Sequence, residues 1–98
     1  MRKNRDMDLS VIIVSYNTAD LIGPCLTSII DQTGGNKEIF VVDNASPDGS
    51  AAMIAANFPD VHLIANKENR GFSVANNQAI AHCRGRYILF LNPDTVLK

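Results

Sequence analysis

Four short apolar runs divide the chain, and each of them predicts a β-strand. They are rich in Val, Ile, Leu and Phe and cover residues 9–14, 38–42, 61–64 and 87–91. The first and fourth runs are almost continuously apolar, which is typical of strands buried on both faces of a parallel sheet. The third run alternates only weakly, so we expect a short outer strand.

The segments between these runs have apolar residues at helical spacing. We expect a first helix that is capped by Thr18 and ended by Gly34 and Gly35, a second over residues 51–57, and a third over residues 71–83 with Gly85 as its C′ residue. The expected buried positions are Leu21, Ile22, Cys25, Leu26, Ile29 and Ile30 in the first helix, Met53, Ile54 and Phe58 in or after the second, and Phe72, Ala75, Ala79 and Cys83 in the third.

Strands and helices alternate along residues 9–98, which predicts an α/β fold with a parallel sheet and right-handed crossovers. The commonest arrangement is a Rossmann-like sheet of about four strands in the order 3-2-1-4, with two helices on one face and the third on the other. Ligands of such sheets bind at the carboxyl ends of the strands, where the strand order reverses. The polar residues expected there are Ser15, Tyr16 and Asn17 after the first strand, Asp43 after the second, and Asn92, Pro93 and Asp94 after the fourth.

The length and composition fit one globular domain preceded by a polar tail at residues 1–8. Of the 98 residues, 46% are hydrophobic and 19% charged, which favours a packed core over disorder. The net charge of −1 provides no basic field for nucleic acid. No apolar stretch approaches the roughly 20 residues of a membrane span, and no signal-peptide pattern opens the chain. We therefore expect a cytoplasmic location. Any membrane attachment of a longer protein, at the inner face of the membrane, is expected to lie beyond Lys98.

Neither the cysteines nor the histidines predict a catalytic or metal site. Cys25 and Cys83 have no metal-ligand spacing, and their helices are expected on opposite faces of the sheet. We interpret them as buried, reduced thiols. His62 and His82 lie on segments that do not reach the carboxyl edge of the sheet, so we interpret both as surface or packing residues.

Several common binding motifs are missing from the sequence. The turn after the first strand has no glycine, which excludes the G-x-G-x-x-G dinucleotide motif. The chain also has no G-x-x-x-x-G-K-[ST] phosphate loop and no G-x-S-x-G nucleophile elbow. The remaining interpretation is a carboxylate-rich nucleotide pocket.

Asp43 and Asp94 each allow a binding role and a purely structural one. Asp43 could accept the imide N–H of a uracil or thymine ring, a charge-assisted bond of about 1.5–3 kcal/mol, or it could cap the turn that follows. Asp94 could hold a divalent ion that bridges two phosphates, as Mg²⁺ commonly does, or it could form an Asx-turn after Pro93. For Asp48 we favour stabilisation of its own turn.

Four segments resemble the successive signatures of the family 2 glycosyltransferases, in matching order and spacing. They are VIIVSYN at residues 11–17, VDNASPDGS at 42–50, NRGF at 69–72 and LNPDT at 91–95. The resemblance implies a GT-A fold, with residues 9–98 as its N-terminal, donor-binding part, truncated after a D-x-D-like motif. It also implies inverting transfer of a sugar from a nucleotide diphosphate to an acceptor hydroxyl, as in surface polysaccharide or cell-wall synthesis.

The resemblance assigns the nucleoside-binding roles by position. It implies that Ser15, Tyr16 and Asn17 line the base and ribose of a UDP-, dTDP- or GDP-sugar. Asp43 would read the pyrimidine.

The phosphate and metal roles are assigned in the same way. Asn69, Arg70 and Gly71 would approach the ribose and diphosphate, with Arg70 contacting a phosphate. Asn92-Pro93-Asp94 takes the place of the family's D-x-D motif, so Asp94 would be the carboxylate ligand of Mg²⁺ or Mn²⁺. Asn92 replaces the first acidic residue, which predicts weaker metal affinity. The Asn-Pro-Asp-Thr form is similar to that of rhamnosyl and other surface-polysaccharide transferases.

Family members continue beyond this motif with an acceptor site and a carboxylate general base, so the base is expected beyond Lys98. General acid–base catalysis typically contributes about 10²–10⁴-fold, and the chain by itself is therefore expected to be inactive or nearly so. The fourth strand would become an exposed sheet edge, and such edges pair with other chains. We therefore expect self-association through this strand or the apolar surface beside it.

Two further classes share this kind of sheet. One is a non-catalytic nucleotide-binding or interaction module, which would bind nucleotides without needing a metal. The other is a receiver-like or flavodoxin-like signalling domain, which expects acidic residues after the first strand. Ser15-Tyr16-Asn17 does not supply them.

Overall fold

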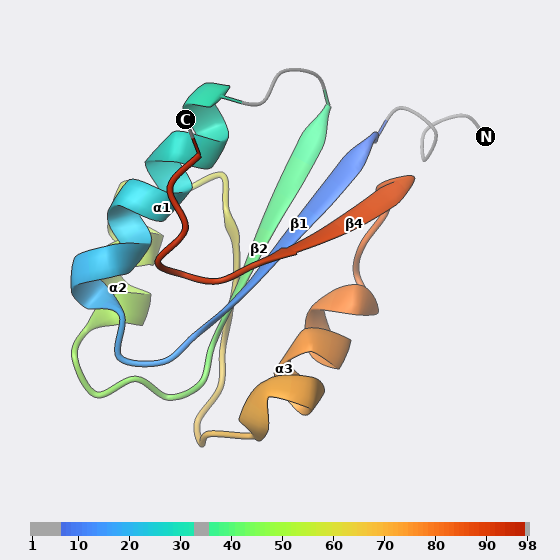
Figure 1. The fold of residues 1–98 in the computed structure, drawn as a ribbon. Helices are drawn as coiled ribbons and strands as arrows, with labels where there is room; N and C mark the ends of the chain where they lie inside the picture. The colour runs from blue at the N-terminus through green and yellow to red at the C-terminus, as the bar shows by residue number, and fades with distance from the viewer. Residues whose placement is uncertain (1–6, 33–35, 98) are drawn as a thin grey trace.

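The structure, a computed structural model, describes residues 7–32 and 36–97. Within these residues, no helix is long and apolar enough to cross a membrane. Strands and helices alternate as the sequence predicts (Figure 1). The elements are β1 (Leu9–Ser15), α1 (Ala19–Gln32), β2 (Lys37–Asp43), α2 (Ser50–Asn57), β3 (His62–Ala65), α3 (Gly71–Ile80) and β4 (Tyr87–Leu91). The expected Gly34–Gly35 helix end lies outside the described residues.

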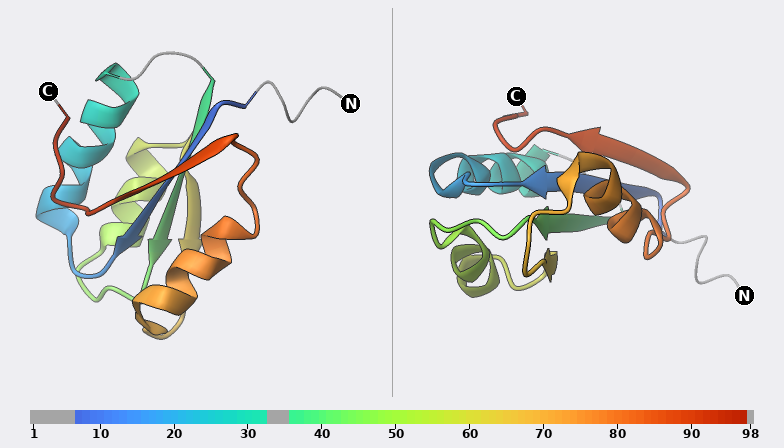
Figure 2. Two further views of the ribbon diagram at one scale, coloured as in Figure 1. Left: turned by 45° about the vertical axis from the view of Figure 1, so that its right-hand side comes forward. Right: turned by 90° about the horizontal axis from the view of Figure 1, so that it is seen from below.

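The strands form one parallel sheet in the order β3-β2-β1-β4, which confirms the predicted topology. β1 pairs with β2 from Leu9↔Lys37 to Ser15↔Asp43 and with β4 from Leu9 to Ile13. α1 and α2 lie on one face and α3 on the other (Figure 2). Because the strands run in the same direction, the loops after β1, β2 and β4 leave from the same edge of the sheet.

Each face of the sheet has its own apolar core. On the face of α3, small side chains let the helix lie close to the strands, and Ala75 and Ala79 are fully buried. Cys25 belongs to the core under α1 and Cys83 packs against the core under α3, and both are free thiols, which confirms that the sheet separates them. The larger core consists of Val11, Ile13, Ile22, Cys25, Leu26, Ile29, Ile39, Val41, Ile54 and Val61, and the smaller of Ile12, Phe40, Val42, Ala75 and Ala79.

The helices bury narrower faces than their sequences predict. Leu21 and Ile30 flank the buried stripe of α1 and are exposed. Phe72, in the first turn of α3, is also exposed, because it lines an open hollow together with Phe90 of β4. α3 ends at Ile80, before the expected residue 83, and its chain continues in turns closed by short-range backbone bonds.

Gly85 does not have the helix-ending role that the sequence predicts, since α3 is already complete at Ala81. Its N–H donates to the Ser10 hydroxyl at 2.8 Å. A Cβ atom at Gly85 would lie 2.5 Å from the backbone nitrogen of Ser10 and 2.7 Å from the carbonyl carbon of Leu9. A glycine is needed here because the chain passes directly against β1 as it enters β4.

The last residues before β1 already pair with both neighbouring segments. The N–H of Asp8 donates to the Asn36 carbonyl at 3.0 Å. The carbonyls of Met7 and Asp8 accept the N–H groups of Arg86 and Tyr87, both at 3.1 Å. The backbone ladder of the sheet therefore begins within the segment expected to be a tail, whose residues 1–6 lie outside the described part.

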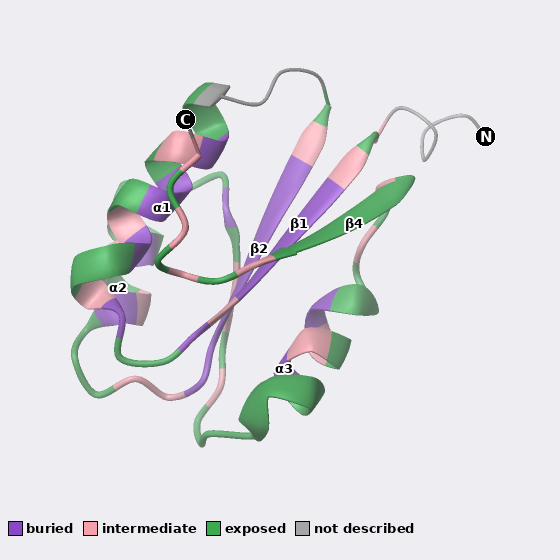
Figure 3. Ribbon diagram, in the orientation of Figure 1, coloured by how far each residue is buried: buried purple, intermediate pink, exposed green. Residues whose placement is uncertain are grey.

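β4 is an edge strand among the described residues, as the sequence predicts. β1 lies on one side of it, and four of its five residues are exposed, whereas β1 and β2 are almost entirely buried (Figure 3). Tyr87 and Phe90 are 69% and 50% exposed. An apolar strand with this much exposed surface is unusual for a single domain in water.

Candidate functional site

The first two strands end side by side at the carboxyl edge of the sheet. Ser15 and Asp43 are register partners, and the N–H of Asn44 donates to the Ser15 carbonyl at 2.9 Å. The Ser15 hydroxyl is buried and bonded to that of Thr18. Of the residues predicted to line a base and ribose, Ser15 therefore faces the interior. Tyr16 and Asn17 are exposed.

Asp43 is buried, and its carboxylate is engaged by the turn that follows it. Oδ2 accepts the Ser46 N–H at 3.0 Å, and Oδ1 accepts the Ser46 hydroxyl at 2.7 Å. The same hydroxyl accepts the Asn17 N–H at 2.7 Å, so Ser46 links the loop after β1 to Asp43. The turn-capping role of Asp43 is thus present in the structure. A bond to a base would use a second acceptor direction of one of these oxygens.

Asp48 caps α1 from the neighbouring loop, in addition to stabilising its own turn as predicted. Its Oδ1 accepts the N–H and the hydroxyl of Ser50, and its Oδ2 accepts the N–H of Ala19 at 2.9 Å. The Ser50 hydroxyl bond, followed by the Ala19 bond, lowers the pKa of Asp48. Thr18, the expected cap, has its hydroxyl bonded to Ser15. The carboxylate also complements the positive end of the α1 dipole.

Asn44 is a buried residue that links the end of β2 to the loop before α3, and the sequence analysis did not single it out. Its Oδ1 accepts the Arg70 N–H at 3.2 Å, and its Nδ2 donates to the Gly71 carbonyl at 3.2 Å. Asn69 closes the same loop by accepting the Gly71 N–H at 2.8 Å. The structure therefore brings the predicted Asn69-Arg70-Gly71 segment to the end of β2. The sequence signal for Asn44 is its place directly after Asp43.

Arg70 is exposed on this loop, at the start of α3. Only its backbone is held, by Asn44, and within the described part of the chain its guanidinium has no ion pair. A guanidinium in this state is suited to an anionic group such as a phosphate.

The segment after β4 leaves the sheet and runs along α1 (Figures 1 and 2). The Cys25 thiol contacts the Asn92 carbonyl at 3.8 Å, and the Leu97 N–H donates to the Ser28 hydroxyl at 3.0 Å. Burial raises the pKa of the Cys25 thiol, and the nearby charge of Asp94 raises it further. Asp94 itself is exposed and makes no hydrogen bond to another described residue. Asp94 thus belongs to a segment that is bonded to α1 on both sides of it, at Asn92 and at Leu97.

The residues present fit a divalent metal only if a ligand supplies most of the coordination. Among residues 7–32 and 36–97, no group of three acidic, His or Cys side chains could hold an ion, and every buried polar side-chain atom has a partner. Asp94 provides one free carboxylate and Asn92 one amide oxygen. Mg²⁺ usually takes one or two protein carboxylates together with phosphate oxygens and waters, which this set can accommodate.

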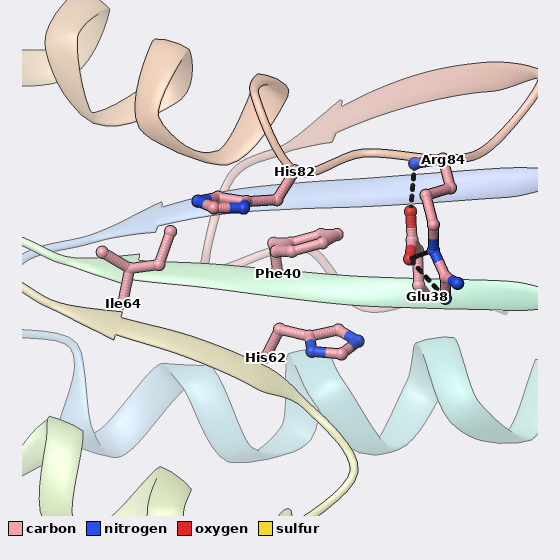
Figure 4. Close-up of a pocket in the computed structure, with 6 residues that line it drawn as sticks. All are labelled: Glu38, Phe40, His62, Ile64, His82 and Arg84. Atoms are coloured by element: carbon pink, nitrogen blue, oxygen red, sulfur yellow. Dashed lines mark hydrogen bonds and ion pairs between the residues drawn. The ribbon is translucent and has the colours of Figure 1, made fainter.

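A separate open hollow lies on the α3 side of the sheet, away from the carboxyl edge (Figure 4). Phe40 and His62 stack in it with ring centroids 4.7 Å apart, and His82 lines it from the loop after α3. Glu38 and Arg84 form an ion pair at 3.4 Å along its margin. His62 thus has a packing role, as the sequence analysis interpreted it.

A model of the family described as "Glycosyl transferase family 2" matches residues 10–98, and the chain belongs to this family. It is 39% identical over 93 residues to the succinoglycan biosynthesis protein ExoO of Rhizobium meliloti (strain 1021). That match covers 93% of this chain and 26% of ExoO. The chain thus spans about a quarter of the length of this curated relative.

Two solved structures have the same arrangement of elements, which confirms the GT-A fold. One is the mannosyltransferase PcManGT from Pyrobaculum calidifontis in complex with GDP-Man and Mn²⁺, with TM-score 0.79 and 33% identity over 90% of this chain and 28% of that one. The other is S. aureus TarS 1-349 in complex with UDP, with TM-score 0.81 and 26% identity over 90% of this chain and 28% of that one.

Proposed function

We propose that residues 9–98 form the donor-binding part of an inverting glycosyltransferase that uses a nucleotide diphosphate sugar in surface polysaccharide or cell-wall synthesis. One observation carries this proposal: loops from three places in the sequence meet around the carboxyl ends of β1 and β2. Ser46 ties the loop after β1 to Asp43, and Asn44 ties the Arg70 loop to the same strand end. The GDP-Man and UDP complexes of the similar structures support a nucleotide-sugar ligand here.

Different residues bind the nucleoside, the diphosphate and the metal in this proposal. Tyr16 and Asn17 present an exposed aromatic ring and amide for the nucleoside, and Asp43 reads the base. Arg70 binds the diphosphate by charge, and its planar guanidinium suits phosphate oxygens. Asn92 and Asp94 would hold Mg²⁺ or Mn²⁺ beside the diphosphate, and the metal would supply positive charge to the leaving group. The Mn²⁺ of the PcManGT complex supports a divalent metal.

We also propose that the chain alone binds donor without transferring the sugar. Transfer to a hydroxyl needs a base within hydrogen-bond reach of the acceptor. Asp43 is committed to bonds from Ser46, and Asp48 to a bond from the N–H of Ala19 at the start of α1. Self-association through β4 belongs to the same proposal, because this apolar strand is an exposed edge.

The decisive experiment is titration of the chain with UDP, dTDP and GDP, with and without Mn²⁺, by calorimetry. dTDP is included because the Asn-Pro-Asp-Thr sequence resembles that of rhamnosyl transferases. We expect binding of one nucleotide to be at least several-fold tighter with Mn²⁺, and this gain to be lost in Asp94→Ala. Asp60→Ala, an exposed aspartate after α2, is the matched control and should keep the gain.

A non-catalytic module of the same fold is the second candidate. It is favoured by Asn92, which leaves one carboxylate in the motif, and by the existing bonds of Asp43. Nucleotide binding of equal strength with and without metal would support the module. Absence of binding to all three nucleotides would refute both candidates.

A further inference from the structure

The Asn44 side chain is almost fully enclosed at 3% exposure, and three separate bonds define its orientation. Its Oδ1 accepts from the Arg70 N–H at 3.2 Å and from the Asn66 Nδ2 at 3.0 Å, while its Nδ2 donates to the Gly71 carbonyl at 3.2 Å. A flipped amide would direct its NH₂ group at two donors. An aspartate would place a carboxylate oxygen against the Gly71 carbonyl. Among common side chains, asparagine alone satisfies all three partners.

The Asn44 side chain is in turn supported by two further amide side chains, those of Asn66 and Gln78. Asn66 and Gln78 form a reciprocal pair, with Asn66 Nδ2 donating to Gln78 Oε1 at 2.9 Å and Gln78 Nε2 donating to Asn66 Oδ1 at 2.8 Å. The Asn66 N–H also donates to the Asp43 carbonyl at 2.9 Å. The end of β2, the chain after β3 and the middle of α3 therefore meet at one amide network, in which Asn44 is buried and Asn66 and Gln78 are partly buried. Such networks have few alternative arrangements, because breaking one bond leaves a buried polar group without a partner.

Asn44 is the residue through which this network contacts the loop that carries Arg70. We propose that Asn44 is a positioning residue, which sets where the Arg70 guanidinium stands relative to Asp43, and this inference rests on the proposed donor-binding function. Asn44 does not touch the nucleotide. It holds the backbone on both sides of the Arg70 Cα, at the N–H of Arg70 and the carbonyl of Gly71. Its effect on binding therefore passes through Arg70 to the diphosphate, and not through the base.

The first test needs no nucleotide. Amide hydrogen exchange by NMR is measured at Arg70 in the wild-type chain, in Asn44→Ala and in Asn44→Asp. We expect exchange at Arg70 to accelerate on the order of tenfold in Asn44→Ala. The acceleration should be smaller in Asn44→Asp, which keeps the acceptor of the Arg70 N–H but faces the Gly71 carbonyl with a second acceptor oxygen. Asn57→Ala is the matched control, since it removes an exposed amide bond to the Met53 carbonyl on α2. Unchanged exchange at Arg70 in Asn44→Ala would overturn the proposal.

The second test separates the diphosphate from the nucleoside. The affinities of UDP and GDP in the presence of Mn²⁺, and of uridine and guanosine, are compared between wild type and Asn44→Ala. We expect about a tenfold loss for the bound diphosphate and less than about a twofold loss for its nucleoside. In an Arg70→Ala background, Asn44→Ala should add no further loss, because both substitutions remove the same interaction. Equal losses for nucleoside and diphosphate, or additive losses in the double variant, would contradict positioning through Arg70.

If Asn44→Ala does not fold, Gln78→Ala takes its place in both tests. It removes the reciprocal pair with Asn66 and leaves the direct bond from Asn44 to Arg70, so the same changes are expected at several-fold size instead of tenfold. If the wild-type chain binds none of the four probes, the donor-binding function fails. The exchange rates would still decide whether Asn44 orders the Arg70 loop.

Discussion

β2 and β4 flank the same central strand, but they have different surroundings. β2 has a strand on each side and a core on each face, and Ile39 in it is 6% exposed. β4 pairs only with β1 among the described residues, and Ile88 in it is 40% exposed. An enclosed strand contributes to stability through its side chains, whereas the open strand leaves apolar surface available for another chain.

The loops after these strands differ in the same way. After β2, Asp43 and Asp48 accept bonds from Ser46, Ser50 and Ala19, and so they serve to hold the loops together. After β4, Asp94 is exposed and makes no hydrogen bond to another described residue. The bonds of Asp43 and Asp48 therefore fix the shape of the loops, whereas the Asp94 carboxylate remains available to a ligand.

The largest expected difference between the strands is in the stability of alanine variants. Ile39→Ala should lower the free energy of unfolding by about 2–5 kcal/mol, because it leaves a cavity in the larger core. Ile88→Ala is the matched change in β4 and should cost less than about 1 kcal/mol, since the side chain is partly in water already. Urea unfolding followed by circular dichroism measures both. Equal losses would show that β4 is enclosed in solution.

Alanine substitution of Asp43 and of Asp94 should change the free energy of unfolding by different amounts. Asp43→Ala removes the acceptor of two Ser46 bonds in a buried site and should cost about 1–3 kcal/mol of unfolding free energy. Asp94→Ala should leave stability within about 0.5 kcal/mol of wild type, because no bond is lost. A comparable loss in Asp94→Ala would mean that Asp94 has a structural role.

Self-association through the open edge of β4 should be weakened by a charge on that strand. Light scattering at high concentration is expected to show self-association of the wild-type chain, and Leu89→Lys should reduce it, because a lysine on an edge strand opposes pairing. Leu21→Lys is the control, because Leu21 is an exposed leucine on α1. A monomeric wild-type chain, or an equal effect of both lysines, would argue against an interface at β4.

The smallest effect concerns Glu38, which joins β2 to the segment that enters β4. Burial raises its pKa, but bonds from the Ser10 hydroxyl, the Arg84 N–H and the Arg84 guanidinium lower the pKa to below its ordinary 4.5. The unfolded chain therefore takes up a proton first, so this contribution is present above the ordinary value and is lost as the pH falls below it. Between about pH 5 and pH 3, the urea midpoint should fall less in Glu38→Gln than in wild type. The exposed Glu68 provides the control, and Glu68→Gln should follow wild type.

Much of the fold could be predicted from local patterns, because strand and helix periodicity is a property of neighbouring residues. The four strands and the buried positions Ile22 and Ala75 followed from it. The order 3-2-1-4 was predicted as the commonest arrangement for alternating strands and helices, and the structure has it. The prediction that Phe72 is buried was wrong, because apolar spacing does not show that the first turn of α3 faces an open hollow. The assignment of Gly85 to a helix end was also wrong. Its actual role depends on a contact with Ser10, and a local pattern cannot show a contact between residues so far apart in the sequence.

In the candidate site, too, local features could be predicted from the sequence and contacts between distant segments could not. The sequence by itself determined which polar residues stand at the carboxyl ends of the strands, since strand direction and loop position are encoded locally. Only the tertiary structure decided which of them are partners: that Ser46 joins Asn17 to Asp43, that Asp48 caps α1, and that Asn44 holds Arg70. These bonds connect segments up to 29 positions apart in the sequence, and their geometry exists only once the sheet has aligned the strand ends.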